Sequence, residues 1–228
     1  MNHYFNLAPA QARHYAGLKP GDEMVIVVPL LEQPPEGYRY IHHDNRTVWF
    51  ELDKIICDEL PYPINARVGM RETWVERVSG YKYKADGNKE DILGHGVSLK
   101  WRSAQSMPVE AIRYWGIVTG TRVDRVQNVI EDEIYEAGIM KGERTVFSKE
   151  LFKDWFGTHY SKPRPRYKNG EIVGYECWCW DNEYPVIKHK GVIVYHSSKD
   201  GSETWTYKGR PLAIHANPWV LITTMRKE

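Results

Sequence analysis

The chain has 228 residues, enough for one large domain or two small ones with a substantial core. Its 31 Lys and Arg residues nearly balance its 30 Asp and Glu residues, and a formal net charge of +1 excludes an overall field that attracts nucleic acid or an acidic membrane. Any contact with nucleic acid must therefore come from a local patch of the surface.

Cysteine content and hydropathy limit the cellular setting. The three cysteines, Cys57, Cys177 and Cys179, cannot form a disulfide framework, and no charged-then-apolar leader opens the sequence. The longest apolar run, 24–31, is far shorter than the roughly 20 residues that cross a bilayer. We therefore expect a cytoplasmic protein without a membrane segment.

The first sixty residues predict a helix, a strand and a hairpin. Residues 8–17, APAQARHYAG, combine an early proline with a closing glycine, which is typical of a short helix. The apolar run EMVIVVPL at 23–30 predicts a strand. At 38–52, two aromatic and β-branched runs flank the polar segment HDNR, which predicts a hairpin. We expect 57–63 to be a connection punctuated by prolines.

The stretch VGMRETWVE at 68–76 mixes charges into an apolar pattern. Alternation along one strand puts Glu72 and Trp74 on one face and Arg71 and Thr73 on the other. Buried charges need partners, so these residues form either an ion-pair network at a strand end or the wall of a pocket that holds a nucleobase. The residues alone leave both interpretations open.

The middle of the chain predicts one long strand and two helices. Residues 79–96 are polar and dotted with glycine, which indicates a long excursion. Residues 113–127 alternate well enough for a central strand. Helices are expected at 129–138 and 148–157, each ending at a glycine.

The last third is rich in strand patterns. KPRPR at 162–166 is extended and basic, and strand patterns follow at 171–180, 191–198, 203–212 and 217–226. An Asp-Gly pair at 200–201 predicts a hairpin turn. Because strands outnumber helices, we expect an α+β, barrel-like domain rather than a parallel sheet.

Few motifs indicate metal or cofactor chemistry. Cys177 and Cys179 have C-x-C spacing, with His189 and His215 downstream, whereas structural zinc sites use C-x₂-C spacing more often. The phosphate-binding loop, the nucleophile elbow and the H-E-x-x-H helix are all absent. We therefore expect no metal and no cofactor.

Lys19 follows the glycine that ends the first predicted helix. A lysine at such a turn can act as a base if burial lowers its pKa. It can equally stabilise the helix by interacting with the negative end of the helix dipole. Both roles remain open at this point.

Several short segments, in this order, resemble motifs of the ASCH-domain proteins of phages and prophages, which belong to the PUA-like superfamily. They are PYPINARVGMRETW, KYKAD, VSLKWRSAQSMPVEAIRYWGIVTGTRVDRVQNV, YEAGI, LFKDWF and NPWVLITTMR. The resemblance covers nearly the whole chain. It implies a single domain over 1–228: a partly open β-barrel flanked by two or three short helices, with a polar excursion at about 79–96 and an inserted β-hairpin region at about 182–215.

The resemblance also implies a ligand and a site. The expected ligand is a nucleotide, a nucleoside or RNA with a modified base, bound in a cleft of the barrel in the cytoplasm of a bacterial host. The residues that we expect to contact it are Arg71, Glu72, Thr73, Trp74, Trp101 and Arg113.

Two alternatives accompany this hypothesis. A bacterial branch with a similar fold hydrolyses the acetyl amide of N4-acetylcytidine, using a lysine after the first helix and a glutamate at a later helix end. Lys19 stands at the lysine position, but Ala137 fills the glutamate position and Glu136 lies one residue away, so the catalytic candidates are Lys19, Glu136 and Glu72. The second alternative is a phage protein that binds a host protein through 79–96 and KPRPR. Enzymatic activity and oligomeric state stay open.

Overall fold

The protein is described from a computed structural model, which covers residues 3–30, 33–34, 37–52, 55–78, 80–87, 100–139, 148–181, 193–197 and 203–228. Over these residues the fold is mixed α+β and dominated by sheets, as the strand-rich sequence predicts. None of the helices in these ranges is long and apolar enough to cross a membrane.

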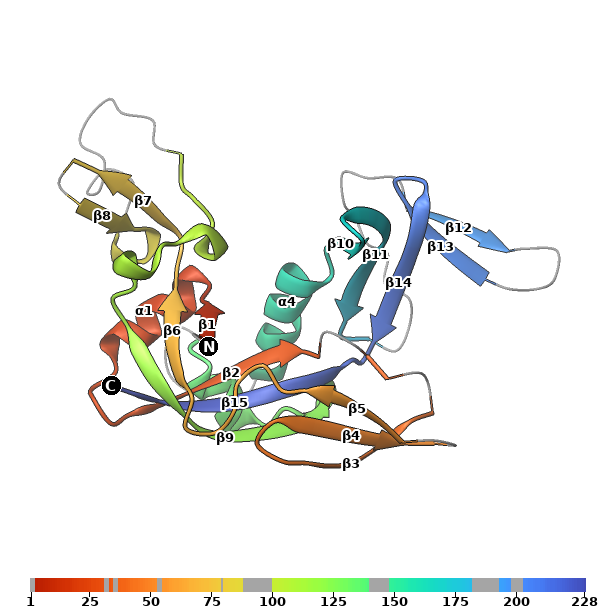
Figure 1. The fold of residues 1–228 in the computed structure, drawn as a ribbon, viewed down its shortest axis with the longest axis horizontal. Helices are drawn as coiled ribbons and strands as arrows, with labels where there is room; N and C mark the ends of the chain where they lie inside the picture. Colours follow the sequence, from red (N-terminus) through yellow and green to blue (C-terminus); the bar gives the residue numbers. More distant parts are fainter. Residues whose placement is uncertain are drawn as a thin grey trace.

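A five-stranded mixed sheet forms the centre of the molecule (Figure 1). In spatial order its strands are β1 (His3–Asn6), β6 (Arg67–Arg71), β9 (Trp115–Arg125), β15 (Trp219–Lys227) and β2 (Glu23–Pro29). β1 runs parallel to β6, and the other neighbours are antiparallel. Because the described part of this sheet ends at β1 and β2, it does not close into a barrel.

The continuous apolar run of β2 is explained by burial on both faces. Met24 and Ile26 pack with Tyr15 of the first helix, whereas Val25 and Val27 belong to a second core with the later helices. Side chains of a strand alternate between its faces, so a strand covered on both sides needs apolar residues at every position.

The α-helices of the described residues pack against this sheet. They are α1 (Pro9–Gly17), α3 (Glu131–Glu136) and α4 (Ser148–Tyr160). α1 was predicted within one residue, and α3 lies inside the predicted range. α4 continues three residues past the predicted end, because the Gly157 carbonyl oxygen still accepts the helical hydrogen bond from Ser161 N, and the rings of Phe156 and Tyr160 pack together at 4.8 Å.

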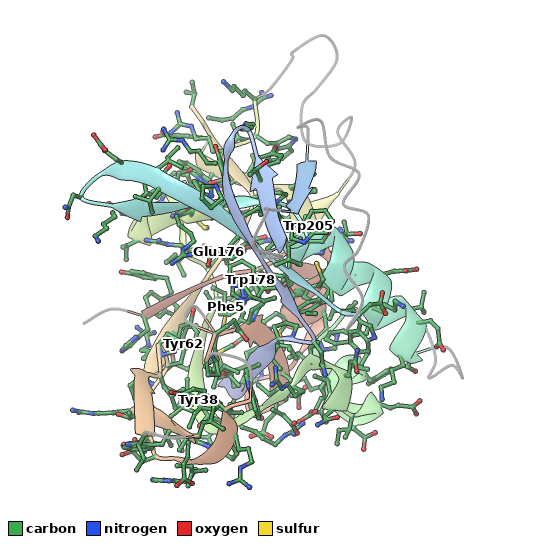
Figure 2. The ribbon with its side chains drawn as sticks, turned by 90° about the vertical axis from the view of Figure 1, so that its right-hand side faces the viewer. Phe5, Tyr38, Tyr62, Glu176, Trp178 and Trp205 are labelled. Atoms are coloured by element: carbon green, nitrogen blue, oxygen red, sulfur yellow. The ribbon has the colours of Figure 1, made fainter. Side chains whose placement is uncertain are left out.

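A second five-stranded sheet is formed by the last third of the chain. Its strands are, in spatial order, β10 (Arg164–Lys168), β11 (Glu171–Cys179), β14 (Arg210–Ala216), β13 (Glu203–Tyr207) and β12 (Ile193–Ser197). β14 leads through Asn217 and Pro218 into β15, so one path of chain connects both sheets (Figure 1). Trp178 of β11 packs into the core shared with β2 and β15 (Figure 2).

Two smaller sheets complete the described structure. The hairpin predicted at 38–52 is confirmed as β3 (Arg39–His43) and β4 (Thr47–Glu51), and Asp44 Oδ1 accepts the turn hydrogen bonds from the backbone N–H groups of Arg46 and Thr47. Part of the predicted connection at 57–63 is instead a third strand, β5 (Ile55–Glu59). The other sheet is the hairpin of β7 (Trp74–Arg77) and β8 (Gly80–Tyr83).

The stretch 68–76 is therefore not one strand. β6 ends at Arg71, Glu72 and Thr73 are unpaired in either sheet, and β7 leaves the central sheet to pair with β8. The alternation of side chains predicted along one strand therefore fails at this break. Glu72 and Trp74 need not lie on the same face as Met70. The predicted excursion at 79–96 begins with β8 and a short 3₁₀ helix at Lys84–Asp86, and 88–96 lie outside the described residues.

Candidate functional site

The break between β6 and β7 places a buried carboxylate next to an arginine. Glu72 is 1% exposed and accepts two hydrogen bonds from Arg113, from Nε to Oε1 at 2.8 Å and from Nη2 to Oε2 at 3.0 Å. Arg113 also donates to both carboxylate oxygens of Asp86, at 2.9 and 2.5 Å. One guanidinium therefore bridges two carboxylates, and we call Glu72, Asp86 and Arg113 the charge network.

Each member of the charge network comes from a different part of the chain. Glu72 follows β6, Asp86 ends the 3₁₀ helix after β8, and Arg113 directly precedes Tyr114 and β9. The Arg113 guanidinium lies 4.0 Å from the Tyr83 ring, whose hydroxyl donates to the carbonyl oxygen of Ala111 at 2.7 Å. The network thus holds the β7–β8 hairpin against the start of β9.

The electrostatics of the charge network indicate an ion-pair network that stabilises the fold. Burial raises the pKa of Glu72 above its ordinary value, and the hydrogen bonds from Arg113 oppose that rise. Four N–H···O contacts to two carboxylates occupy nearly all donors of Arg113. Arg113 is therefore engaged by two carboxylates of the protein, and an anionic ligand would have to pair with a different cation.

Two neighbouring arginines offer that cation. The guanidinium of Arg71 lies 3.9 Å from the Tyr4 ring, and its Nη1 makes one long hydrogen bond of 3.4 Å to the carbonyl oxygen of Gln105. Arg102 is exposed and lies 5.0 Å from the Trp74 ring. Among the described residues, no carboxylate pairs with either guanidinium, and the buried Nε of Arg71 has no acceptor.

The remaining residues expected to bind ligand support this surface. Trp74 is 2% exposed, and the Tyr81 ring lies edge-on to it at 5.6 Å, so its own ring is not open to solvent. Its ring instead lies against the guanidinium of Arg102. The carbonyl oxygen of Thr73 accepts a hydrogen bond from Lys84 N at 2.9 Å. Trp101 is half-buried, and its indole Nε1 finds no acceptor within the described ranges.

The structure gives Lys19 no buried environment. Its side chain is exposed, and its backbone N–H donates to Asp22 Oδ2 at 2.8 Å. The C-terminus of α1 is capped instead by Lys227, whose Nζ donates to the carbonyl oxygens of Tyr15, Ala16 and Leu18 at 2.9, 3.2 and 2.7 Å. The electrostatic role considered for Lys19 is thus filled by a residue from the last strand.

The other two catalytic candidates, Glu136 and Glu72, lie in different environments. Glu136 is exposed at the end of α3, where its backbone forms a hydrogen bond with His14 of α1. Glu72, by contrast, is buried in the charge network, and the described hydrogen bonds and ion pairs do not join it to Lys19. The two glutamates thus occupy different surroundings, one exposed and one enclosed.

Potential metal ligands do not gather in the described part of the chain, where no three His, Cys, Asp or Glu side chains could hold an ion together. Cys177 and Cys179 are free and buried in the core of the second sheet. The hydrogen bond with the neighbouring Cys179 thiol, together with burial, raises the pKa of the Cys177 thiol well above its ordinary value and so favours the protonated form.

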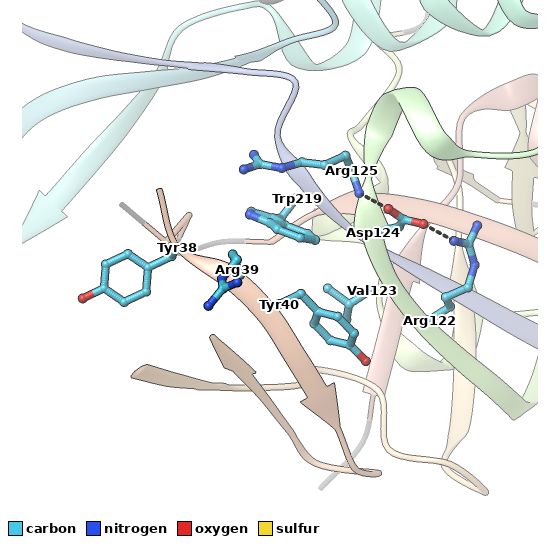
Figure 3. A pocket seen from close by; sticks show the side chains of 8 residues that line it. All are labelled: Tyr38, Arg39, Tyr40, Arg122, Val123, Asp124, Arg125 and Trp219. Carbon is cyan, nitrogen blue, oxygen red and sulfur yellow. Dashed lines mark hydrogen bonds and ion pairs between the residues drawn. The ribbon is translucent and has the colours of Figure 1, made fainter. Parts of the chain in front are cut away.

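A cavity that the sequence did not reveal lies at the other end of β9. Its volume is about 650 Å³, and it is lined by Tyr38, Arg39, Tyr40, Arg122, Val123, Asp124, Arg125 and Trp219 (Figure 3). The segment R-V-D-R at 122–125 places three charged residues at the end of a predicted strand. This is the feature of the sequence that could have indicated a site here. Only the fold shows that Trp219 and β3 complete the wall.

The basic segment KPRPR and the excursion also have defined places. β10, which contains most of KPRPR, is an edge strand whose residues are all exposed, and Arg164 lies 5.3 Å from the Tyr160 ring. The excursion is described only to Gly87.

No protein-family model, curated protein or solved structure matches this chain.

Proposed function

We propose that the protein binds nucleotides or single-stranded nucleic acid and is a phage-type ASCH-domain protein with a PUA-like, partly open barrel. The open mixed sheet with few helices is compatible with this fold. Three segments that resemble the family, RETW, KYKAD and the arginine after MPVEAI, supply Glu72, Asp86 and Arg113, which meet in one network. Their convergence supports the resemblance on structural grounds.

The observation that carries the proposal is a pair of arginines beside this network with which no carboxylate of the described residues forms an ion pair. Arg71 rests on Tyr4 and Arg102 on Trp74, while Gln105, three residues after Arg102, accepts the hydrogen bond from Arg71. Guanidinium groups that lie over aromatic rings and are not held by a carboxylate can bind phosphates and stack on bases. With a net charge of +1, such a local site favours a short ligand over a long polyanion.

Titration of short single-stranded RNA and DNA oligonucleotides, followed by fluorescence anisotropy, tests the proposal. We expect Arg71→Ala and Arg102→Ala each to weaken binding by about ten-fold, the effect of losing one charge-assisted contact. Arg67→Ala is a matched control, because Arg67 also lies on a ring, Trp115 at 4.1 Å, but already pairs with Glu228 at 2.7 Å. It should bind like the wild type.

Two results overturn the proposal: no binding of any oligonucleotide at millimolar concentration, or equal affinities for all three variants. N4-acetylcytidine belongs in the same ligand panel, with release of cytidine followed by chromatography. Product that disappears in Lys19→Ala would support the amidohydrolase alternative in place of simple binding. If no cytidine is released, the amidohydrolase alternative is rejected, and the oligonucleotide titrations alone decide the binding proposal.

A further inference from the structure

The cavity at the C-terminal end of β9 is lined by two arginines from different strands, Arg125 at the end of β9 and Arg39 on β3. Arg125 is half-buried and donates from Nη1 to the carbonyl oxygen of Asn217 at 2.9 Å, and its guanidinium lies 4.3 Å from the Trp219 ring. Arg39 is exposed at the cavity wall. No carboxylate side chain of the described residues forms an ion pair with either guanidinium.

The other charged residues of the cavity are satisfied internally. Arg122 donates to both oxygens of Glu133, at 2.8 and 2.6 Å from Nη2, and also to Asp124. Asp124 in turn accepts from the backbone N–H of Arg125 at 2.7 Å and from Asn128 at 2.8 Å. Asp124 is therefore held by Arg122, by the backbone of Arg125 and by Asn128, and it forms no ion pair with the Arg125 guanidinium.

Desolvation makes Arg125 the stronger anion receptor of the two. Burial lowers the pKa of Arg125, and no ion pair with a described carboxylate offsets that cost. A half-buried cation without a counter-ion is stabilised when an anion binds, since the ligand supplies the missing charge in a place where water screens it poorly. Arg39 can approach the same anion from solvent.

The walls of the cavity are aromatic. Figure 3 shows Arg125 along one side of Trp219, with Arg39 and Tyr40 toward its other side. Tyr40 is held in place because its hydroxyl bonds His43 Nδ1 at 2.7 Å, while His43 Nε2 bonds the carbonyl oxygen of Thr121 at 2.9 Å. Rings fixed in this way can stack on a planar ligand, an interaction worth about 1–3 kcal/mol for a nucleobase.

We propose that this cavity binds a small ligand that combines a planar ring with a phosphate, such as a nucleoside monophosphate. Its volume of about 650 Å³ lies within the range of about 300–1,000 Å³ found for ligand pockets. The phosphate pairs with Arg125 and Arg39, and the ring packs against Trp219 and Tyr40. A phosphate monoester, which carries up to two negative charges, matches these two arginines, which pair with no described carboxylate, better than a phosphodiester does.

This cavity is distinct from the proposed oligonucleotide surface. β9 has eleven residues, so its two ends lie roughly 30 Å apart. β6 runs antiparallel to β9 from Ile117 to Trp115, so Arg71 lies beyond the start of β9, whereas Arg125 lies at its end. The two sites can therefore fail or succeed separately.

Isothermal titration calorimetry with the full chain tests the proposal. The ligands are the four common nucleoside monophosphates, the uncharged nucleosides, phenyl phosphate and inorganic phosphate. We expect at least one monophosphate to bind about ten-fold more tightly than its nucleoside or inorganic phosphate, because each lacks half of the contacts. Equal binding of phenyl phosphate would assign the site to ring phosphates in general.

Variants locate the binding. Arg125→Lys keeps a charge but loses the planar guanidinium, and it should weaken binding by about ten-fold. Arg39→Ala should do the same, and it removes no side-chain hydrogen bond or ion pair to the described residues. Arg226→Ala, which removes an exposed arginine at the far end of β15, should leave the binding unchanged. Thermal unfolding of each variant shows that it is folded. No monophosphate binding at millimolar concentration, or unchanged binding in both cavity variants, overturns the proposal.

Discussion

At the scale of single residues, the clearest feature is how differently the arginines are employed. Arg113 is held by two carboxylates, Arg67 by one exposed carboxylate, and Arg71 and Arg125 by none of the described ones. A sequence shows all of these simply as arginine. Because a guanidinium already bridged between carboxylates contributes to stability and an unpaired one can take a ligand, the partners decide the role.

The charge network should therefore contribute strongly to stability. Arg113→Ala leaves the buried Glu72 carboxylate without its partner, and breaking a buried pair costs about 3–5 kcal/mol. Because the Arg113 side chain is 25% exposed, we expect a loss near the low end, about 3 kcal/mol, in the free energy of unfolding measured with urea.

The exposed pair supplies the control for this measurement. Arg67→Ala removes the ion pair with Glu228, whose side chains are 55% and 36% exposed, and should cost no more than about 1 kcal/mol. A loss for Arg113→Ala that does not exceed the loss for Arg67→Ala would show that the network contributes little.

At the scale of elements, two glycines that the sequence treats alike have opposite roles. Both were expected to end a helix. Gly138 does follow α3 in a left-handed conformation with φ of +63°, and a Cβ built there would lie 2.4 Å from His14 Cβ. Gly157 lies inside α4 with no atom within 4 Å of the same position. α1 and α3 thus meet at Gly138, whereas Gly157 has room for a side chain.

Alanine substitutions separate the two glycines. Gly138→Ala should lower the free energy of unfolding by more than about 1–2 kcal/mol, the cost of the left-handed conformation alone, because His14 must also move. Gly157→Ala should raise it by about 0.5–1 kcal/mol through improved helix propensity. Urea unfolding of both variants measures the difference, and a destabilised Gly157→Ala would contradict the reading of α4 as an ordinary helix interior.

At the scale of the whole molecule, two histidines in separate parts of the fold link stability to pH. Burial lowers the pKa values of His14, on α1, and His215, on β14, below the ordinary value of 6.5. The unfolded chain then binds protons more readily than the folded chain, so the stability associated with neutral imidazole is present above pH 6.5 and is lost as the pH falls through the folded-state pKa values.

We therefore expect the free energy of unfolding to decline as the pH falls below 6.5, and the variant His14→Gln/His215→Gln to show a shallower decline than the wild type. Urea titrations at a series of pH values give both slopes. Identical slopes would mean that other groups, such as acidic side chains, govern the pH dependence.

Local patterns in the sequence were sufficient to predict many of the elements. α1, β2, the β3–β4 hairpin, the central position of β9 and the final strand follow from turn residues and apolar periodicity, which act over a few neighbouring positions. The site was predicted less completely. The pattern around Arg71 and Glu72 indicated charged groups near a strand end, but it could not distinguish a paired arginine from an unpaired one.

What the sequence by itself determined is the α+β composition, the near-neutral charge and the clustering of aromatic and charged residues around 68–76 and 113–127. Only the tertiary structure shows that the predicted strand is interrupted between β6 and β7, and that Lys227 rather than Lys19 caps α1. It alone also shows that Arg125 and Trp219 line the same cavity. The physical reason is that charge pairing and cavities depend on residues brought together from distant positions, whose proximity no local pattern encodes.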